Sequence, residues 1–412
     1  MKCRSFAQCT ITENDIKKKK YRLADFINAH WEDYVKSPKT RILPEQFKAI
    51  NAIRVCRTAA LGIDVYACPE CGEIKEIYHS CKHRFCPTCS YQDTVEWANR
   101  IHQKLLAVPH RHITCTLPHE LIPLIKLNRR LLFGILQRSA AHTFTDWINS
   151  KYKLKTGVTS VSHSFGEQKT YHPHAHMLVA WGGIHNENHQ LIKINSSDFV
   201  NYKFLKKKFR HKFEDELFIA FDKKKMKHHF HTRKEFETFI KSINKKDWII
   251  HLEKPVDNLL NLIKYIGRYI KRACISEYKI TNIEGDYISF RYKDYKDRDA
   301  NKKAKEKILT LHYYDFFPRL LQHVPEVGMQ IVRHYGAYAN RVKNAAQHLT
   351  VTRNTRVDNS NKGKTIICKS CNVEMIYSYT YIKHRQTKSR RDNQEEIHKY
   401  IRQNIYGKIK IA

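Results

Sequence analysis

Histidines occupy alternating positions in Tyr171-His172-Pro173-His174-Ala175-His176-Met177-Leu178-Val179-Ala180, which continues into an apolar, strand-forming segment. Residues two apart in a β-strand point to the same side of the sheet. We therefore expect His174 and His176 to present their imidazoles side by side, with Ala175 facing away. Two neutral imidazoles in this arrangement can hold one divalent metal ion and leave positions for a substrate oxygen. In a chain with 25 histidines, the competing interpretation is a half-exposed strand that merely carries them.

The segment before this strand supplies a candidate for a third metal ligand. Residues 158–166 are also typical of a strand, and the turn that follows predicts an antiparallel hairpin. His163 then lies on the adjacent strand of the same hairpin. A slip of one residue in the register would turn its side chain to the other face. Glu167, Gln168 or a polar group from the helix predicted over Asn258–Arg272, which carries two tyrosines, therefore remain alternatives.

A second element strengthens the metal interpretation. The spacing of apolar residues over Asn258–Arg272 predicts a helix, with Tyr265 and Tyr269 on one face and Lys264 and Arg268 adjoining them. Two tyrosines four residues apart usually form a packing pair. Beside a metal-binding strand, however, a phenolate is a competent nucleophile for phosphorus, and the cations can stabilise developing charge. All four side chains are therefore candidate catalytic residues.

The charge of the chain points to a polyanion as its partner. Lys and Arg number 75 against 40 Asp and Glu, a formal charge of +35 over 412 residues. Proteins with such an excess of positive charge most often bind nucleic acid. The lysine runs at 206–208 and 223–225 either form a solvated helix face or line a groove for a DNA backbone. No apolar run is long enough to span a bilayer and residues 1–20 lack the apolar core of a signal peptide, so we expect a cytoplasmic protein without a membrane partner.

Twelve cysteines in a reducing compartment argue for metal binding. Cys68, Cys71, Cys86 and Cys89 follow the pattern C-x2-C-x14-C-x2-C, which predicts one structural zinc site closed by four thiolates. His79, Cys81 and His83 lie between the two pairs, so one of them could replace a cysteine or a second ion could be shared.

Two features of the C-terminal region carry weaker signals. Cys368 and Cys371 form half of such a pattern, and His384 is one conceivable partner. The segment 363–365 is similar to the end of a phosphate-binding loop, but Asp358 stands where that loop requires glycine. We therefore expect no ATP to be bound.

The remaining pattern predicts the order of helices and strands. We expect further strands near 111–117, 248–253, 275–292 and 308–314, an amphipathic helix over 121–147, and a mostly helical segment over 316–342.

Several blocks in this order resemble one known family. It is the HUH rolling-circle transposases of bacterial insertion sequences, of the insertion-sequence ninety-one type, which use two tyrosines and carry an N-terminal zinc-binding domain. The blocks are Cys56–Gly62, Ser80–Cys89, Thr116–Pro118, His163–Gly166, His172–His176, Tyr265–Tyr269 and Arg333–Gly336, and they span about residues 50–345.

The resemblance implies a metal-dependent DNA strand transferase. The histidine pair would hold Mg²⁺ or Mn²⁺ on the scissile phosphate, while a tyrosine attacks and stays joined to the 5′ end of the DNA. The phosphotyrosine bond conserves energy, in agreement with the missing phosphate loop. The substrates would be the single-stranded ends of the transposon and its target. Which tyrosine attacks first, the DNA sequence and the oligomeric state are left open.

The prediction is thus an α+β fold in which an HUH nuclease core, an antiparallel sheet flanked by helices, follows a helical leader and a zinc-ribbon-like domain. Alternatives are a rolling-circle replication initiator or relaxase with the same chemistry, and a non-catalytic zinc-ribbon remnant that only binds DNA. The expected domains are a basic helical leader over 1–55, a zinc-binding domain over 56–100, the HUH core over 101–345 and a basic tail over 346–412.

Overall fold

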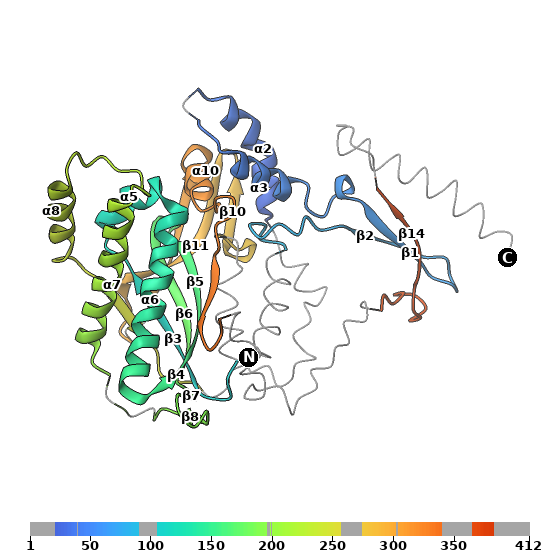
Figure 1. Cartoon of the computed structure of the whole chain (residues 1–412). Helices are drawn as coiled ribbons and strands as arrows, with labels where there is room; N and C mark the ends of the chain where they lie inside the picture. Colours follow the sequence, from blue (N-terminus) through green and yellow to red (C-terminus); the bar gives the residue numbers. More distant parts are fainter. Residues whose placement is uncertain are drawn as a thin grey trace. The chain divides into compact units, whose positions relative to one another are not determined.

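The structure is a computed structural model, and it divides the chain into two compact units. One unit combines Met1–Ser90 with Arg356–Ala412, and the other is Tyr91–Thr355. Both contain helices and antiparallel strands, which confirms the predicted α+β class (Figure 1). The structure describes residues 21–38, 40–89, 105–195, 198, 200–256, 274–301, 304–339 and 365–382.

Two helices of the predicted leader belong to the first unit. They are α2 (Leu23–Lys36) and α3 (Pro44–Arg54), which contact each other. The fully buried Trp31 of α2 packs against Phe47 of α3, with ring centroids 6.2 Å apart. Burial of such a large apolar side chain is what an amphipathic helix pair needs in order to be stable. The leader therefore has a small core of its own.

The sheet of the first unit joins the two ends of the chain. The short 3-10 helix η2 (Ala59–Leu61) precedes the hairpin of β1 (Ile63–Ala67) and β2 (Ile74–Tyr78). Strand β14 (Ile376–Tyr381) pairs antiparallel with the other side of β1, so the strand order is β14-β1-β2. This corrects the expectation of a separate C-terminal tail, because its described part completes the N-terminal sheet.

A five-stranded antiparallel sheet with the order β13-β5-β6-β3-β9 lies at the centre of the second unit. Its two long strands, β5 and β6, form the hairpin predicted around the histidines. Strand β3 pairs with the other side of β6. The bounds are β3 (His110–Thr116), β5 (Gly157–Phe165), β6 (Tyr171–Ala180), β9 (Ile249–Leu252) and β13 (Val332–Gly336).

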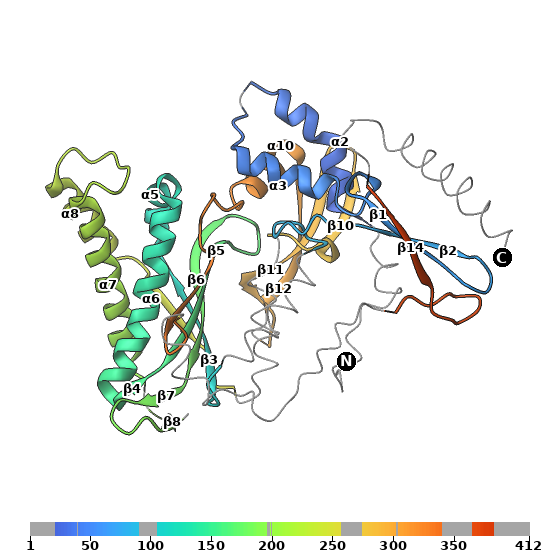
Figure 2. The ribbon, with the colours of Figure 1, turned by 45° about the vertical axis from the view of Figure 1, so that its right-hand side comes forward.

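Helices cover one face of this sheet. Helix α6 (Arg129–Tyr152) packs on β5 and β6, and α7 (Tyr202–Asp222) packs on α6 (Figures 1 and 2). Met177 and Val179 of β6 point into this core, whereas Leu178 belongs to a second apolar cluster. Because side chains alternate along a strand, the even-numbered histidines of β6 lie on the face away from α6.

The lysine run in α7 lies on a solvated face of that helix. Lys206 and Lys207 are exposed, whereas Phe209 and Phe213 are fully buried in the main core of the second unit. The helix is therefore amphipathic, with its lysines on the side away from the core. Exposed lysines fit both a solvated face and a groove for a DNA backbone, so both interpretations of this run stay predictions.

The segment after residue 316 differs from the mostly helical prediction. Helix α10 ends at Leu321, and β13 follows as a partner of β5. Pro325 and Gly328, the latter at φ +74°, interrupt the helical pattern, and β5 offers an edge for pairing.

Within the described residues, no helix combines the length and apolar character needed to cross a membrane.

Two smaller sheets and several helices form the rest of the second unit as far as the structure describes it. The sheets have the orders β10-β11-β12 and β4-β7-β8. The bounds are η3 (His119–Leu121), α5 (Ile122–Leu127), β4 (Leu154–Lys155), β7 (Gly182–His185), β8 (Leu191–Lys193), α8 (Arg233–Ile243), η4 (Glu277–Lys279), β10 (Ile280–Glu284), β11 (Tyr287–Arg298), β12 (Ala304–His312) and α10 (Tyr313–Leu321).

Candidate metal centres

Three histidines meet on the face of the central sheet away from α6. In the β5–β6 hairpin, His163 pairs directly with His174, and Val161 pairs with His176. Residues that pair across an antiparallel ladder point to the same face. The imidazole nitrogens of His163, His174 and His176 that could act as ligands lie within 4.8 Å of one another. The register thus places the first candidate for a third ligand beside the predicted pair.

Burial keeps the imidazoles of His174 and His176 neutral, which is the form that binds metal ions. All three side chains are less than a tenth exposed. Burial, followed by the nearby His172, lowers the pKa of His174 to about 4, and burial also holds the pKa of His176 well below its ordinary value. The two Nε2 atoms of His174 and His176 are 3.0 Å apart. This set fits a divalent ion that accepts nitrogen donors.

A chain of polar contacts from β3 and from the residue that follows β9 orients His176. Nε2 of His112 lies 2.9 Å from Nδ1 of His176, and Nδ1 of His112 lies 3.0 Å from Oε1 of Glu253. The contact with His112 lowers the pKa of Glu253. The Thr114 hydroxyl is also 3.2 Å from His176 Nδ1. Such contacts fix which ring nitrogen of a ligand faces the metal ion.

Sequence reasoning missed His112, Thr114 and Glu253 as parts of this site. The available signal was the predicted strand over 111–117, on which residues 112 and 114 share a face. Nothing in the sequence placed that strand beside the histidine strand, because the pairing spans more than 60 residues.

The alternative ligands of the prediction lie apart from the histidine group, and its catalytic candidates lie outside the described residues. Glu167 pairs with Nζ of Lys279 at 2.7 Å, and Gln168 is exposed; neither joins the histidine group within the described part of the chain. The catalytic candidates Lys264, Tyr265, Arg268 and Tyr269 lie outside the described residues.

The buried histidines of this unit should make it sensitive to acid. Burial lowers the pKa values of His110 and His323 to about 3 and that of His174 to about 4, whereas an unfolded histidine titrates at about 6.5. Below about pH 6.5 the unfolded chain therefore binds protons that the folded chain does not, and stability falls as the pH falls.

Between about pH 4.5 and pH 6, where all three are neutral when folded and protonated when unfolded, these groups should lower the unfolding free energy by about 4 kcal/mol for each unit that the pH falls. The check is urea unfolding of the chain at pH 7.5 and pH 5.5 with a metal chelator present. A midpoint that stays the same between these pH values contradicts this burial.

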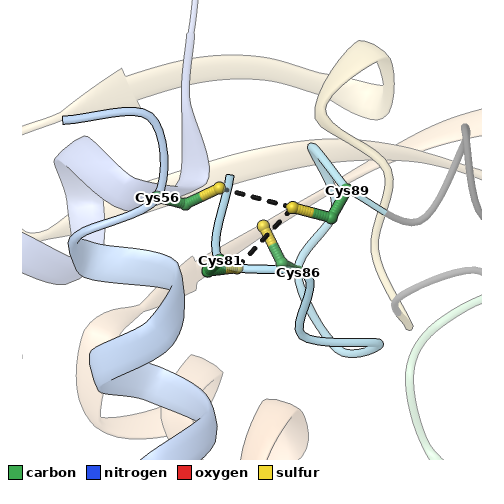
Figure 3. A group of neighbouring side chains, drawn as sticks. All are labelled: Cys56, Cys81, Cys86 and Cys89. Carbon is green, nitrogen blue, oxygen red and sulfur yellow. Dashed lines mark hydrogen bonds between the residues drawn. The ribbon is translucent and has the colours of Figure 1, made fainter. Parts of the chain in front are cut away.

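Eight cysteines gather in two groups of four, both in the first unit. Cys56, Cys81, Cys86 and Cys89 form one group, shown in Figure 3, and Cys68, Cys71, Cys368 and Cys371 form the other. In each group the Sγ atoms lie within 4.8 Å of one another.

The single site predicted from Cys68, Cys71, Cys86 and Cys89 is therefore corrected. The two C-x2-C turns face different partners, because β14 brings a third turn against the first one. Cys81, the possible extra ligand of the prediction, does lie in the group with Cys86 and Cys89. Cys56 was missed, since it precedes the pattern by twelve residues and has no neighbouring cysteine.

The first cysteine group has the close sulfur contacts of a thiolate site. Sγ of Cys89 lies 3.4 Å from that of Cys56 and 3.6 Å from that of Cys81. Contacts with Cys81 and Cys86 lower the pKa of Cys56 to about 7, and the contact with Cys56 leads those that hold the pKa of Cys89 well below its usual range. Contacts led by Cys56 raise the pKa values of Cys81 and Cys86 instead, so the four sulfurs need a cation beside them to be thiolates together, and zinc supplies that charge.

Two family models match the parts of the chain that carry these centres. Residues 26–117 match a model described as "Transposase zinc-binding domain", and residues 157–346 match one described as "Putative transposase". The first range contains Cys56, Cys81, Cys86 and Cys89, and the second contains the histidine group. These matches define the class of the chain, a transposase with an N-terminal zinc-binding domain.

Comparison with curated proteins narrows this class. The chain is 30% identical over 328 residues to "Putative transposase y4qJ" of Sinorhizobium fredii, covering 78% of this chain and 81% of that protein. It is 26% identical over 308 residues to the transposase for insertion sequence element IS801 of Pseudomonas savastanoi pv. phaseolicola, covering 72% and 71%. No solved structure matches. The chain belongs to the insertion-sequence ninety-one family of two-tyrosine transposases, which confirms the resemblance.

Proposed function

We propose that this transposase cleaves and rejoins single-stranded DNA through a 5′-phosphotyrosine intermediate, in transposition of the rolling-circle type. The observation that carries the proposal is the group of His163, His174 and His176, which lies on the sheet face inside the region that matches the transposase model. The second unit would then be an HUH nuclease core, and the first unit would be a zinc-stabilised domain that assists DNA binding.

Each strand transfer exchanges one phosphate ester for another. The phenol of Tyr265 or Tyr269 releases its proton to solvent and its oxygen forms a bond to phosphorus. The bond from phosphorus to the 3′ oxygen breaks, and that oxygen takes up a proton from solvent and leaves as a 3′ hydroxyl. Lys264 and Arg268 favour the phenolate and stabilise charge on the phosphate. Attack by a 3′ hydroxyl on the phosphotyrosine reverses the exchange, so no ATP is consumed.

The histidine group would hold Mg²⁺ or Mn²⁺, and the bound ion would polarise the scissile phosphate. Imidazole donors bind Mn²⁺ more strongly than the oxygen-preferring Mg²⁺. We therefore expect Mn²⁺ to support cleavage at lower concentration. Glu253 and His112 act through His176 by fixing its orientation.

Formation of a covalent protein–DNA adduct tests this function. The chain is incubated with Mn²⁺ and labelled single strands that carry the end of its insertion sequence, then denatured and separated by electrophoresis. A labelled band at the mass of protein plus DNA supports the proposal, and its loss with chelator shows the metal dependence. Absence of an adduct on single strands that nevertheless bind would favour the non-catalytic remnant. A replication initiator or relaxase would form the adduct but would not join transposon ends to a target strand.

Binding to single-stranded DNA should weaken steeply with salt. The formal charge of +35 provides many cations for phosphate contacts, and each contact releases a counterion. A plot of log affinity against log salt concentration should have a slope of about −0.7 for each phosphate contacted. The slope is measured by fluorescence anisotropy of a labelled oligonucleotide at KCl concentrations from about 50 to about 300 mM. A salt-independent affinity would point to another class of partner.

A further inference from the structure

The second cysteine group draws its members from regions far apart in the sequence. Cys68 and Cys71 lie in the turn between β1 and β2, whereas Cys368 and Cys371 lie in a turn just before β14. Sγ of Cys71 and Sγ of Cys368 are 3.6 Å apart although 297 residues separate them in the chain. All four thiols are free, so no disulfide accounts for their proximity.

The two turns have the same backbone structure. Cys68 N–H donates to the carbonyl of Glu73 at 2.8 Å, and Cys368 N–H donates to the carbonyl of Val373 at 2.9 Å. The N–H groups of Gly72 and Asn372 donate back to the carbonyls of Cys68 and Cys368 at 3.0 and 3.1 Å.

A left-handed residue follows the second cysteine of each turn. Gly72 has φ +74° and Asn372 has φ +57°. Glycine adopts this conformation freely, and asparagine is among the few other residues that tolerate it. The sequences C-P-E-C-G and C-K-S-C-N therefore encode one structure twice. Two such turns that face each other are the usual frame of a four-cysteine zinc site.

The spacing of the sulfurs fits a tetrahedral ion. With Zn–S bonds of about 2.3 Å, neighbouring sulfurs in a tetrahedron lie about 3.8 Å apart. The observed 3.6 Å between Cys71 and Cys368 is close to this value and far from a covalent sulfur–sulfur bond of about 2.05 Å. Four thiolates close the coordination shell, so such a site is structural.

The surrounding structure links the two turns but offers little apolar core. Glu73 accepts hydrogen bonds from the Cys368 thiol at 3.0 Å and from the Ser370 hydroxyl at 3.2 Å. Among the described residues, one small buried cluster consists of Ile63 and Val65, and the other consists of Met375 with Cys68 and Cys368. Sheets with so little buried apolar area commonly depend on a metal ion for stability.

We propose that Cys68, Cys71, Cys368 and Cys371 bind a second structural zinc ion, which fastens the C-terminal strand β14 to the N-terminal sheet. The site goes beyond the function proposed above and does not depend on it. Cys368 and Cys371 lie outside both regions that match family models, which end at residues 117 and 346. The N-terminal zinc domain of this chain is therefore completed by its far end.

Zinc stoichiometry tests the proposal directly. We expect two zinc ions per full-length chain by mass spectrometry of the metal, against protein measured by amino-acid analysis. Cys371→Ser should contain about one zinc ion, and so should Cys86→Ser, which removes a ligand of the other group. The variant with both changes should contain almost none. Cys115→Ala, which removes a buried thiol of the second unit, is the control and should retain two.

A second measurement on the unchanged chain covers the case in which Cys371→Ser fails to fold. The native protein is alkylated briefly with iodoacetamide, with and without a strong zinc chelator, and the modified cysteines are identified by peptide mass spectrometry. Cys71, which is exposed, and Cys371 should react only after chelation. One zinc ion per native chain, iron in place of zinc, rapid alkylation of both cysteines, or a disulfide between Cys71 and Cys368 would each overturn the proposal. None of these readouts depends on DNA cleavage.

Discussion

Replacing His176 with alanine should reduce metal-dependent cleavage by about two orders of magnitude or more. His176 lies between the other members of the site: its ring nitrogens are 3.0 Å from His174 and 2.9 Å from His112. Its loss removes one nitrogen donor and leaves His112 without the group it orients. Metal ions in such reactions contribute several kcal/mol of transition-state stabilisation, and each 1.4 kcal/mol is about a factor of ten in rate.

Both the rate of adduct formation and the affinity for Mn²⁺ should be measured for this variant. Calorimetric titration of Mn²⁺ reports on the site without any reaction. His142→Ala is the matched control, because His142 is an exposed histidine of α6 in the same unit. The effect of Glu253→Gln should lie between those of His176→Ala and His142→Ala. We expect a loss of about 10-fold to 100-fold in metal affinity or activity, as for other groups that orient a metal ligand.

The same experiment with His163→Ala decides the third ligand. A large loss of Mn²⁺ affinity is expected, because His163 pairs directly with His174 across the hairpin. If His163→Ala retains wild-type affinity and cleavage, the third donor comes from elsewhere and the assignment of His163 fails.

The double variant Tyr265→Phe, Tyr269→Phe should form no covalent adduct. An unperturbed phenol has a pKa of about 10, so the reaction requires a tyrosine beside cations and a metal-polarised phosphate. One helical turn separates the two residues in the predicted helix, which allows both to reach the same phosphate in turn. Each phenylalanine removes only an oxygen atom, so binding of single-stranded DNA should remain nearly unchanged.

The single variants separate the two strand transfers. If one tyrosine holds a 5′ end while the other attacks, Tyr265→Phe or Tyr269→Phe should still cleave but should not complete transposition. Labelled single strands with Mn²⁺ measure cleavage, and a two-plasmid transposition assay measures the full reaction. An adduct that persists in the double variant would rule out both residues as nucleophiles and leave the histidine site to act with another group.

The histidine hairpin was predictable from sequence because its signals are local. Alternation along 171–180 sets the face, and the short turn before it sets the neighbouring strand. His112 and Glu253 were not predictable as partners, since β3 and β9 reach His176 only through pairings distant in sequence. β13 shows the same limit: a pattern that favoured helix became a strand because β5 provided an edge to pair with.

The cysteines show what spacing can and cannot predict. The pattern C-x2-C predicts a tight turn that presents two sulfurs, and all three such turns in the described residues are present. Spacing does not reveal which turn faces which, since that depends on the strand that arrives beside β1. The prediction therefore joined the turn at Cys68–Cys71 to the nearest one in sequence, at Cys86–Cys89. In the structure it faces the distant turn at Cys368–Cys371 instead.

The pairing of β1 with β14 also sets an order of events during synthesis. Cys71 leaves the ribosome 297 residues before Cys368, which at about 5–20 residues per second is about 15 to 60 s. Throughout that interval the nascent chain carries only two of the four cysteines of the second group, while the whole of the intervening unit emerges and can fold. A chain that terminates before residue 366 lacks the strand that completes the sheet, whatever the state of its nuclease unit. Strand β14 thus distinguishes a chain whose N-terminal sheet has its third strand from one whose sheet lacks it.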